Sequence, residues 1–222
     1  MGRCRRMGFL LGALLAFTGL ISLPAKTLTF DQEKCHVDVP EPWTEQSVPG
    51  NIASWVSADQ TKSFVLRIVQ TGLDITVDDP AFLGGVEKSM LAQGVTITNR
   101  QPATLAGLAG REIDNPQTAP QGAVYNRMTI VMANGNAYAL LVSKLGSPPE
   151  QDDELNGIVN SFGFIGTPEL HHAGVPSENR LSVLVGQVVG FFVALLAVVS
   201  LFKWIRRRAR DRSQPPPPPQ AG

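Results

Sequence analysis

The sequence has little of what disulfide scaffolds, metal centres and nucleic-acid-binding folds require. It holds 2 cysteines and 3 histidines in 222 residues, and two cysteines exclude a disulfide-dense scaffold. Residues 26–180 carry 10 Lys plus Arg against 18 Asp plus Glu, a net charge of −8, whereas nucleic-acid binding needs a basic stripe. Phosphate-loop, dinucleotide-binding and zinc-protease motifs are missing from the sequence. The composition therefore points away from these functional classes.

Two apolar segments flank this acidic region. Residues 9–23 are mostly apolar, follow three arginines and end close to Ala25. This pattern is typical of a secretory signal peptide cleaved after Ala25, and an uncleaved signal anchor is the alternative. Residues 181–202 are 22 residues without a formal charge, which is long enough to span a bilayer. One lysine and five arginines follow, so the positive-inside rule places the C-terminus in the cytoplasm.

The chain is therefore predicted to be a single-pass protein of the plasma (inner) membrane, with its domain outside the cytoplasm. Residues 166–180 are polar, contain prolines and glycine, and are expected to be a flexible tether reaching roughly 20 Å. The predicted segments are a signal peptide (1–25), an extracytoplasmic domain (26–165), the tether (166–180), a transmembrane helix (181–205) and a basic, proline-rich cytoplasmic tail (206–222).

Within the domain, short β-rich runs alternate with two helical patterns. Asp78 or Asp79 before Pro80 predicts the start of one helix, which ends at Gly94. Asn134-Gly135 between two apolar runs predicts a β-hairpin. Strands are expected at residues 27–30, 34–39, 52–57, 64–69, 95–98, 108–113, 123–133 and 136–144, and a closing helix at 150–162. The predicted fold class is α+β, an antiparallel sheet flanked by helices.

Candidate catalytic residues are few. Cys35 and His36 are adjacent in a predicted strand, so their side chains point to opposite faces and cannot form a nucleophile–base pair. Cys35 is either a buried small hydrophobe or a redox-sensitive or intermolecularly paired thiol. The acidic groups near residues 78 and 152 could bind cations, but helix capping explains them more simply. We expect no enzyme activity, no cofactor and no metal.

Two features are candidate contact sites. Trp43 follows Pro42 and is either an exposed aromatic for partner binding or packed over the end of the sheet. Gly186, Gly190 and Ala194 recur every four residues in the apolar segment. This spacing allows close helix packing, so a homodimer or another membrane protein is a candidate partner there.

Several short motifs resemble a known family. The segment 35–43, Cys-His-Val-Asp-Val-Pro-Glu-Pro-Trp, resembles the opening strand and Val-x-x-Pro-x-x-Trp motif of PsbP-like domains. The hairpin through Gly135 and Tyr138, and the later Ser161-Phe162-x-Phe164, are similar to their closing elements, and residues 107–111 to their central glycine-rich strand entry. The resemblance covers about residues 27–165 and implies an antiparallel sheet sandwiched by helices. Its relatives are mostly non-catalytic binding and assembly proteins, and a C-terminal anchor is not part of their general pattern.

These observations predict a membrane-anchored, extracytoplasmic binding or assembly module that acts on a protein of the cell envelope. The bilayer itself contacts residues 181–205. The alternative is a carrier or sensor of a small apolar ligand or lipid, which requires a large apolar pocket between sheet and helix.

Overall fold

The structure is a computed structural model, and it describes residues 24–48, 50–92, 94–119 and 121–172. Residues 1–23 of the predicted signal peptide, most of the tether, the apolar segment and the basic tail lie outside this range. The elements are β1 (Ala25–Phe30), β2 (Cys35–Pro40), β3 (Thr44–Glu45), β4 (Ala53–Val56), β5 (Lys62–Gln70), α1 (Pro80–Ala92), β6 (Asn99–Leu105), β7 (Leu108–Ala119), β8 (Gly122–Ala133), β9 (Asn136–Leu145), the 3₁₀ helix η1 (Pro149–Gln151), α2 (Asp153–Ser161) and β10 (Gly163–Phe164).

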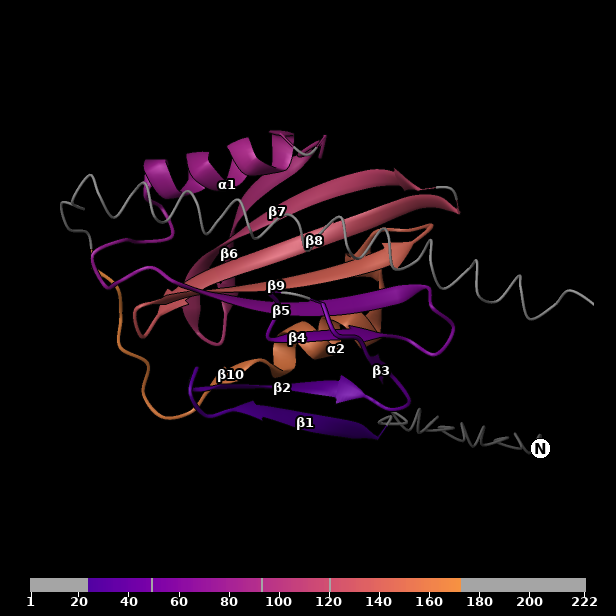
Figure 1. Ribbon diagram of the computed structural model, residues 1–222, viewed down its shortest axis with the longest axis horizontal. Helices are drawn as coiled ribbons and strands as arrows, with labels where there is room; N and C mark the ends of the chain where they lie inside the picture. The colour runs from indigo at the N-terminus through magenta and orange to yellow at the C-terminus, as the bar shows by residue number, and fades with distance from the viewer. Residues whose placement is uncertain (1–23, 49, 93, 120, 173–222) are drawn as a thin grey trace, which may run out of the picture.

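Two antiparallel sheets organise these elements, as Figure 1 shows. The large sheet has seven strands in the order β3-β4-β5-β9-β8-β7-β6, and the small one has the order β1-β2-β10. Helix α1 packs on one face of the large sheet, while α2 and the small sheet lie on its other face. The predicted α+β fold class, an antiparallel sheet flanked by helices, is confirmed.

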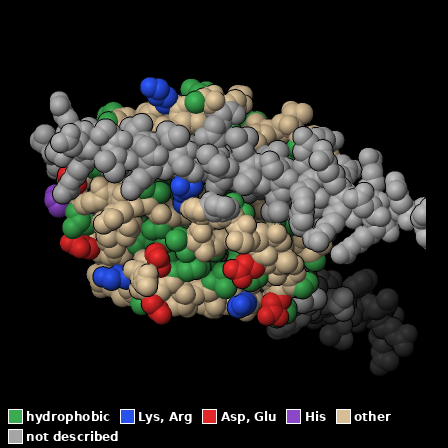
Figure 2. All heavy atoms as spheres, viewed as in Figure 1, with side chains coloured by type: hydrophobic (Ala, Val, Ile, Leu, Met, Phe, Trp, Pro, Cys, Tyr) green, Lys and Arg blue, Asp and Glu red, His purple; other side chains and the backbone are tan. Residues whose placement is uncertain are grey.

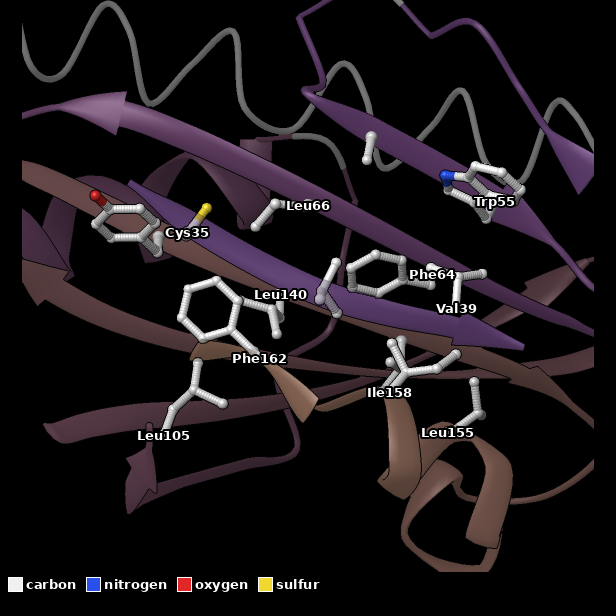
Figure 3. Packing of buried hydrophobic residues seen from close by; sticks show 14 of the residues in the cluster. Cys35, Val39, Trp55, Phe64, Leu66, Leu105, Leu140, Leu155, Ile158 and Phe162 are labelled. Atoms are coloured by element: carbon white, nitrogen blue, oxygen red, sulfur yellow. The ribbon is translucent and has the colours of Figure 1, made fainter. Parts of the chain in front are cut away.

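The large sheet is buried on both faces because its central strands are apolar on both sides. In β5, Val65 faces the α1 side, whereas Phe64 and Leu66 face the α2 side. Figure 3 shows the second core, where Leu155 and Ile158 rise from α2 toward the strands. Each space between the layers is filled by a cluster of buried side chains.

Helix α1 begins and ends where the sequence predicts. Asp79 Oδ1 accepts hydrogen bonds from the N–H groups of Ala81 (2.8 Å) and Phe82 (3.2 Å), so Asp79 is the N-cap residue. At the other end Gly94 has φ 74° and donates to Leu91 O, while Val95 N–H donates to Met90 O. These two bonds form a Schellman motif.

The Schellman motif explains why the strand predicted at residues 95–98 is wrong. Val95 belongs to the helix end and is buried against the α1 core. The strand begins instead at Asn99, and its pattern is hard to recognise because β6 holds Pro102 and mostly exposed residues. Pro102 is tolerated there because β6 is an edge strand.

The central hairpin is confirmed. Asn134 and Gly135 have φ values of 54° and 72°, and β8 and β9 pair in register from Ala133↔Asn136 to Val124↔Leu145. Two positive φ values match a type I′ turn, the conformation that Asn-Gly favours. The preceding strand, β7, continues beyond the predicted Ile113 to Ala119 because it remains paired with β8 along this whole length.

The closing helix is shorter than predicted. Asp152 has extended backbone angles and separates η1 from α2, so residues 150–162 do not form one helix. The carboxylate of Asp152 accepts a hydrogen bond from Leu155 N–H at 3.1 Å and caps α2. The helix predicted at 150–162 is therefore interrupted at Asp152, which is the N-cap residue of α2.

Only part of the predicted tether, residues 166–172, is described, and this part returns to the domain. Leu170 forms an isolated bridge with Ala133, and Glu169 O accepts a hydrogen bond from Asn134 N–H at 2.8 Å. His172 N–H donates to Leu73 O at 3.0 Å. The last described residue, His172, therefore lies on the domain, in the segment that contacts the β8–β9 turn.

Among the described residues, no helix is both long enough and apolar enough to cross a membrane. Residues 1–23 of the predicted signal peptide and the whole predicted transmembrane helix, with Gly186, Gly190 and Ala194, lie outside the described residues, whereas Ala25 is the first residue of β1.

Candidate functional site

A surface groove lies where the open end of the small sheet meets α2. Its volume is about 620 Å³. The lining comes from the ends of β1 and β2, the start of β5, and one side of η1 and α2: Ala25, Asp38, Pro40, Lys62, Gln151, Asp152, Asp153, Glu154, Gly157, Ile158 and Ser161. The charged lining residues are four acids and one lysine, a net charge of −3. We call this the acidic groove.

The floor of the groove is held by a cluster of ion pairs. Lys62 Nζ lies 3.0 Å from Asp152 Oδ2 and 2.6 Å from Glu154 Oε2. Lys144 Nζ lies 2.8 Å from the same oxygen of Asp152. Lys62 and Lys144 are directly opposed in the β5–β9 register. Two like charges at such a position would repel, so the Asp152 carboxylate between them stabilises the sheet and the helix start together.

This arrangement shifts the pKa values of the paired groups. Burial alone would raise the pKa of Asp152, but hydrogen bonds from Lys144 and Lys62, together with the Leu155 N–H, lower it to about 2. Burial alone would lower the pKa of Lys62, but its hydrogen bonds to Glu154 and Asp152 raise it. Asp152 and Lys62 are therefore charged at neutral pH.

A third cation extends this cluster beyond the groove. Arg127 of β8 pairs with Glu150 of η1 at 3.1 Å, and with Glu112 (3.3 Å) and Asp114 (3.2 Å) of β7. The strands β5, β9 and β8 thus each supply one cation to the acidic segment that begins the closing helix. This acidic segment is fixed on the sheet, so its outward carboxylates are presented in a defined position.

The outward carboxylate is Asp153. It is exposed in the first turn of α2 and has no ion-pair or hydrogen-bond partner among the described side chains. Asp38, on the opposite wall, accepts a hydrogen bond from Thr27 Oγ1 at 2.6 Å. Its backbone N–H donates to Ser161 Oγ at 2.9 Å, which joins β2 to α2. The groove can therefore offer Asp153 and Asp38 to a cationic ligand.

Trp43 lies beneath this site rather than on the surface. Its side chain is 7% exposed and belongs to the α2-side core. Indole Nε1–H donates to Glu154 Oε1 at 2.9 Å. Of the two interpretations of Trp43, the structure agrees with packing, and Trp43 supports the groove by fixing Glu154.

Cys35 and His36 lie apart, as the strand pattern predicts. The Cys35 side chain is 0% exposed, and burial, with a contribution from Glu33, raises the pKa of its thiol to about 12. His36 lies on the other face of β2, with its ring over Gly163. Cys35 therefore has the character of a buried hydrophobe.

The acidic pairs that could have bound cations serve as caps and ion-pair partners. Asp79 and Asp152 cap α1 and α2, and Asp78 pairs with Arg111 at 2.7 Å. His171 Nδ1 lies 2.6 Å from Ile75 O. In the sequence, Asp152–Glu154 are recognisable as helix-start residues that could also bind cations. Lys62 and Asp38 are not recognisable as parts of the site, because their sequence positions give no sign that they meet α2.

The surface around the site is mixed in charge. Figure 2 shows acidic and basic side chains interspersed with hydrophobic ones along the lower part of the visible face, over the small sheet and β4. The net charge of the groove thus arises from its local lining.

Antiparallel sheets with two packed helices define a small α+β domain, and this domain carries a charged groove. No family model matches the sequence, and no curated protein matches it. Among solved structures, the chain is similar to cyanobacterial PsbP (CyanoP) from Synechocystis sp. PCC 6803, with a TM-score of 0.51 and 12% identity over 69% of this chain and 98% of that one. This similarity shows that the fold is PsbP-like, which confirms the resemblance found in the sequence.

Two weaker similarities were also found. The Ran-binding protein Mog1p of Saccharomyces cerevisiae has a TM-score of 0.44 and 13% identity, over 65% of this chain and 97% of that one. LpqN, involved in cell envelope biogenesis of Mycobacterium tuberculosis, has a TM-score of 0.39 and 13% identity, over 63% of this chain and 84% of that one.

Proposed function

We propose that this protein is a membrane-anchored, extracytoplasmic binding module whose acidic groove holds a basic segment of an envelope protein. The observation that carries the proposal is the groove itself, with a net charge of −3 and an outward carboxylate at Asp153. Complementary charge speeds association and selects partners. The apolar C-terminal segment and its basic flank support the anchor.

A rigid groove suits recognition because little ordering is needed when a partner binds. The three cations from β5, β9 and β8 fix the acidic segment, and the Asp38–Ser161 bond fixes the distance between the walls. The proposed role is non-catalytic. In support of this, Cys35 is buried with a raised thiol pKa, and His36 lies on the other side of its strand.

The alternative, a carrier of an apolar ligand or lipid, has less support. It needs an apolar cavity between layers, yet both spaces between sheet and helix are filled by clusters of buried residues. The groove described above is lined mainly by charged and polar residues.

The test is crosslinking of the intact, tagged protein in its native membrane, followed by capture. Two controls are the anchor and tail without residues 26–180, and a charge-neutralised groove carrying Gln151→Lys and Asp153→Lys, whose lining has a net charge of 0 in place of −3. Both positions are exposed and lie outside the Lys62 ion-pair cluster. The matched variant is Asp31→Lys, an exposed acid at the opposite end of the small sheet.

We expect a stoichiometric envelope protein to be captured by the wild type and by Asp31→Lys, but neither by the groove variant nor by the deletion. Capture should weaken as ionic strength rises, because exposed charges are screened. Equal capture by wild type and groove variant would reject the groove as the binding surface. Capture that also persists in the deletion would reject the domain as the binding module.

A further inference from the structure

The last described segment, residues 165–172, fixes the point where the chain leaves the domain. It is held by the β8–β9 turn through Asn134 and by the loop after β5 through Leu73 and Ile75. In Figure 1 it runs up one end of the molecule, from β10 toward the end of β5 where β9 begins. We call this region the exit end.

The exit end and the acidic groove lie at opposite ends of the domain. Lys62 lines the groove at the start of β5, whereas Gln70 at the other end of β5 pairs with Asn136, next to the exit end. The two ends of a nine-residue strand lie roughly 27 Å apart. Strand β2 of the small sheet is arranged in the same way. Its last residue, Pro40, lines the groove, and its first residue, Cys35, pairs with β10, from which the exit end continues.

The exit end also presents apolar side chains. Ile165 is 41% exposed and Leu170 is 61% exposed. They are two of the four exposed large hydrophobic residues in the described part of the chain, and both lie on this one segment. Residues of this kind favour the interfacial region of a bilayer when a tether holds them close to it.

The remaining tether is short. Eight residues, 173–180, separate His172 from the uncharged segment that begins at Leu181. A flexible chain of this length has a mean span of roughly 16 Å, which is less than the length of β5. These eight residues are therefore too short for the domain to turn its groove easily toward the membrane surface that would hold the segment beginning at Leu181.

We propose that the exit end lies against the lipid headgroups, through Ile165 and Leu170, and that the acidic groove faces away from the bilayer. The proposal rests on the membrane anchor in the proposed function. The neighbouring β1–β2 turn carries Asp31 and Glu33 as well as Lys34. The contact therefore comes from the tether and the apolar side chains, and does not require anionic lipid.

The test places a fluorophore at each end of the full-length protein in lipid vesicles containing a headgroup-nitroxide quencher. One variant is Glu169→Cys at the exit end and the other is Asp153→Cys in the groove, both at exposed positions. Cys4, in the predicted signal peptide, is replaced by serine in every version. Cys35 is fully buried and is not labelled in the folded chain, as the Cys4→Ser protein without a further substitution will check. The vesicles are phosphatidylcholine, with and without phosphatidylglycerol.

We expect the label at position 169 to be quenched several-fold more strongly than the label at position 153, in both lipid mixtures. The double variant Ile165→Ser and Leu170→Ser should reduce quenching at position 169. Equal quenching at both positions, stronger quenching at position 153, or failure of the chain to join the vesicles would overturn the proposed orientation.

The orientation and the binding function fail separately. Asp153→Lys should abolish partner capture and leave quenching at position 169 unchanged. If the labels at positions 169 and 153 are quenched equally while the partner is still captured, only the proposed orientation is rejected. Asymmetric quenching with no partner captured rejects only the binding function.

Discussion

Lys62 and Lys144 face each other across β5 and β9, and both ammonium groups bind one oxygen of Asp152, at 3.0 Å and 2.8 Å. The other oxygen of Asp152 caps α2, so this carboxylate couples the helix start to the ends of the two central strands of the large sheet. Asp152 is 7% exposed, so its removal leaves two cations together in a partly buried place.

Asp152→Ala should therefore destabilise the protein by about 2–4 kcal/mol, through loss of a helix cap and of a mostly buried ion-pair partner. The free energy of unfolding can be measured by denaturant titration of the full chain in detergent. The neighbouring Asp153→Ala is the control and should cost about 1 kcal/mol or less, since Asp153 interacts mainly with the helix dipole. Equal losses would contradict the shared-oxygen account.

The lowered pKa of Asp152, about 2 against an ordinary value of 3.8, predicts a dependence of stability on pH. A depressed carboxyl pKa contributes stability that is complete above pH 4 and is lost as the pH falls toward 2. Unfolding titrations between pH 5 and pH 2 should show this loss in the wild type. Asp152→Asn should flatten that part of the profile, whereas Asp31→Asn should leave it unchanged.

Gly163 is required by the ring of His36. A Cβ atom at position 163 would lie 2.6 Å from His36 Cε1 and 2.8 Å from Nε2. Gly163→Ala should destabilise the protein by about 1–3 kcal/mol, because one side chain or strand must shift. The double variant with His36→Ala should recover most of the loss, and additive effects in this cycle would show that the two positions are independent.

A substitution in the β6–β7 turn can make the protein more stable. Ala106 and Gly107 have φ values of 50° and 78°. Ala106 therefore occupies the left-handed region although it has a Cβ atom and no polar side chain that could form a local hydrogen bond there. Ala106→Asn should raise the free energy of unfolding by about 0.5–1 kcal/mol and give this turn the Asn-Gly pair found at residues 134–135. Ala106→Val should lower it, since β-branched residues resist positive φ.

Cys35 should be inert to thiol reagents in the folded protein. Its side chain is fully buried and its thiol pKa is raised to about 12, so the reactive thiolate is rare near pH 8. In a Cys4→Ser chain, maleimide labelling of Cys35 should be slow in native conditions and complete in denaturant. Rapid native labelling, or a disulfide-linked dimer through Cys35, would restore the redox interpretation.

Local signals predicted the elements whose structure is decided locally. Asn134-Gly135, Asp79-Pro80 and the apolar faces of residues 64–69 each specify a turn, a cap or a buried strand through neighbours in the sequence. The prediction for residues 95–98 failed because Val95 closes a Schellman motif, a use of an apolar residue that strand patterns do not distinguish.

The acidic groove could not be predicted in the same way. Its walls meet through Asp38 and Ser161, which are 123 residues apart, and Lys62 reaches Asp152 over 90 residues. Only the pairing of strands brings these side chains together, and no periodicity in the sequence reports it. The PsbP-like resemblance predicted the fold and carried over no binding residue.

The pairing of β2 with β10 and the hydrogen bond from β2 to Ser161 have a consequence for the order in which the domain can form during synthesis. The second strand is made early, yet its partners α2 and β10 emerge only near the end of the domain. Trp43, Val39 and their neighbours thus have no complete core to enter until residue 164 has been delivered. The ordered domain is a product of the whole segment, so a chain synthesised from its N-terminus can complete this core only when nearly all of the domain has been made.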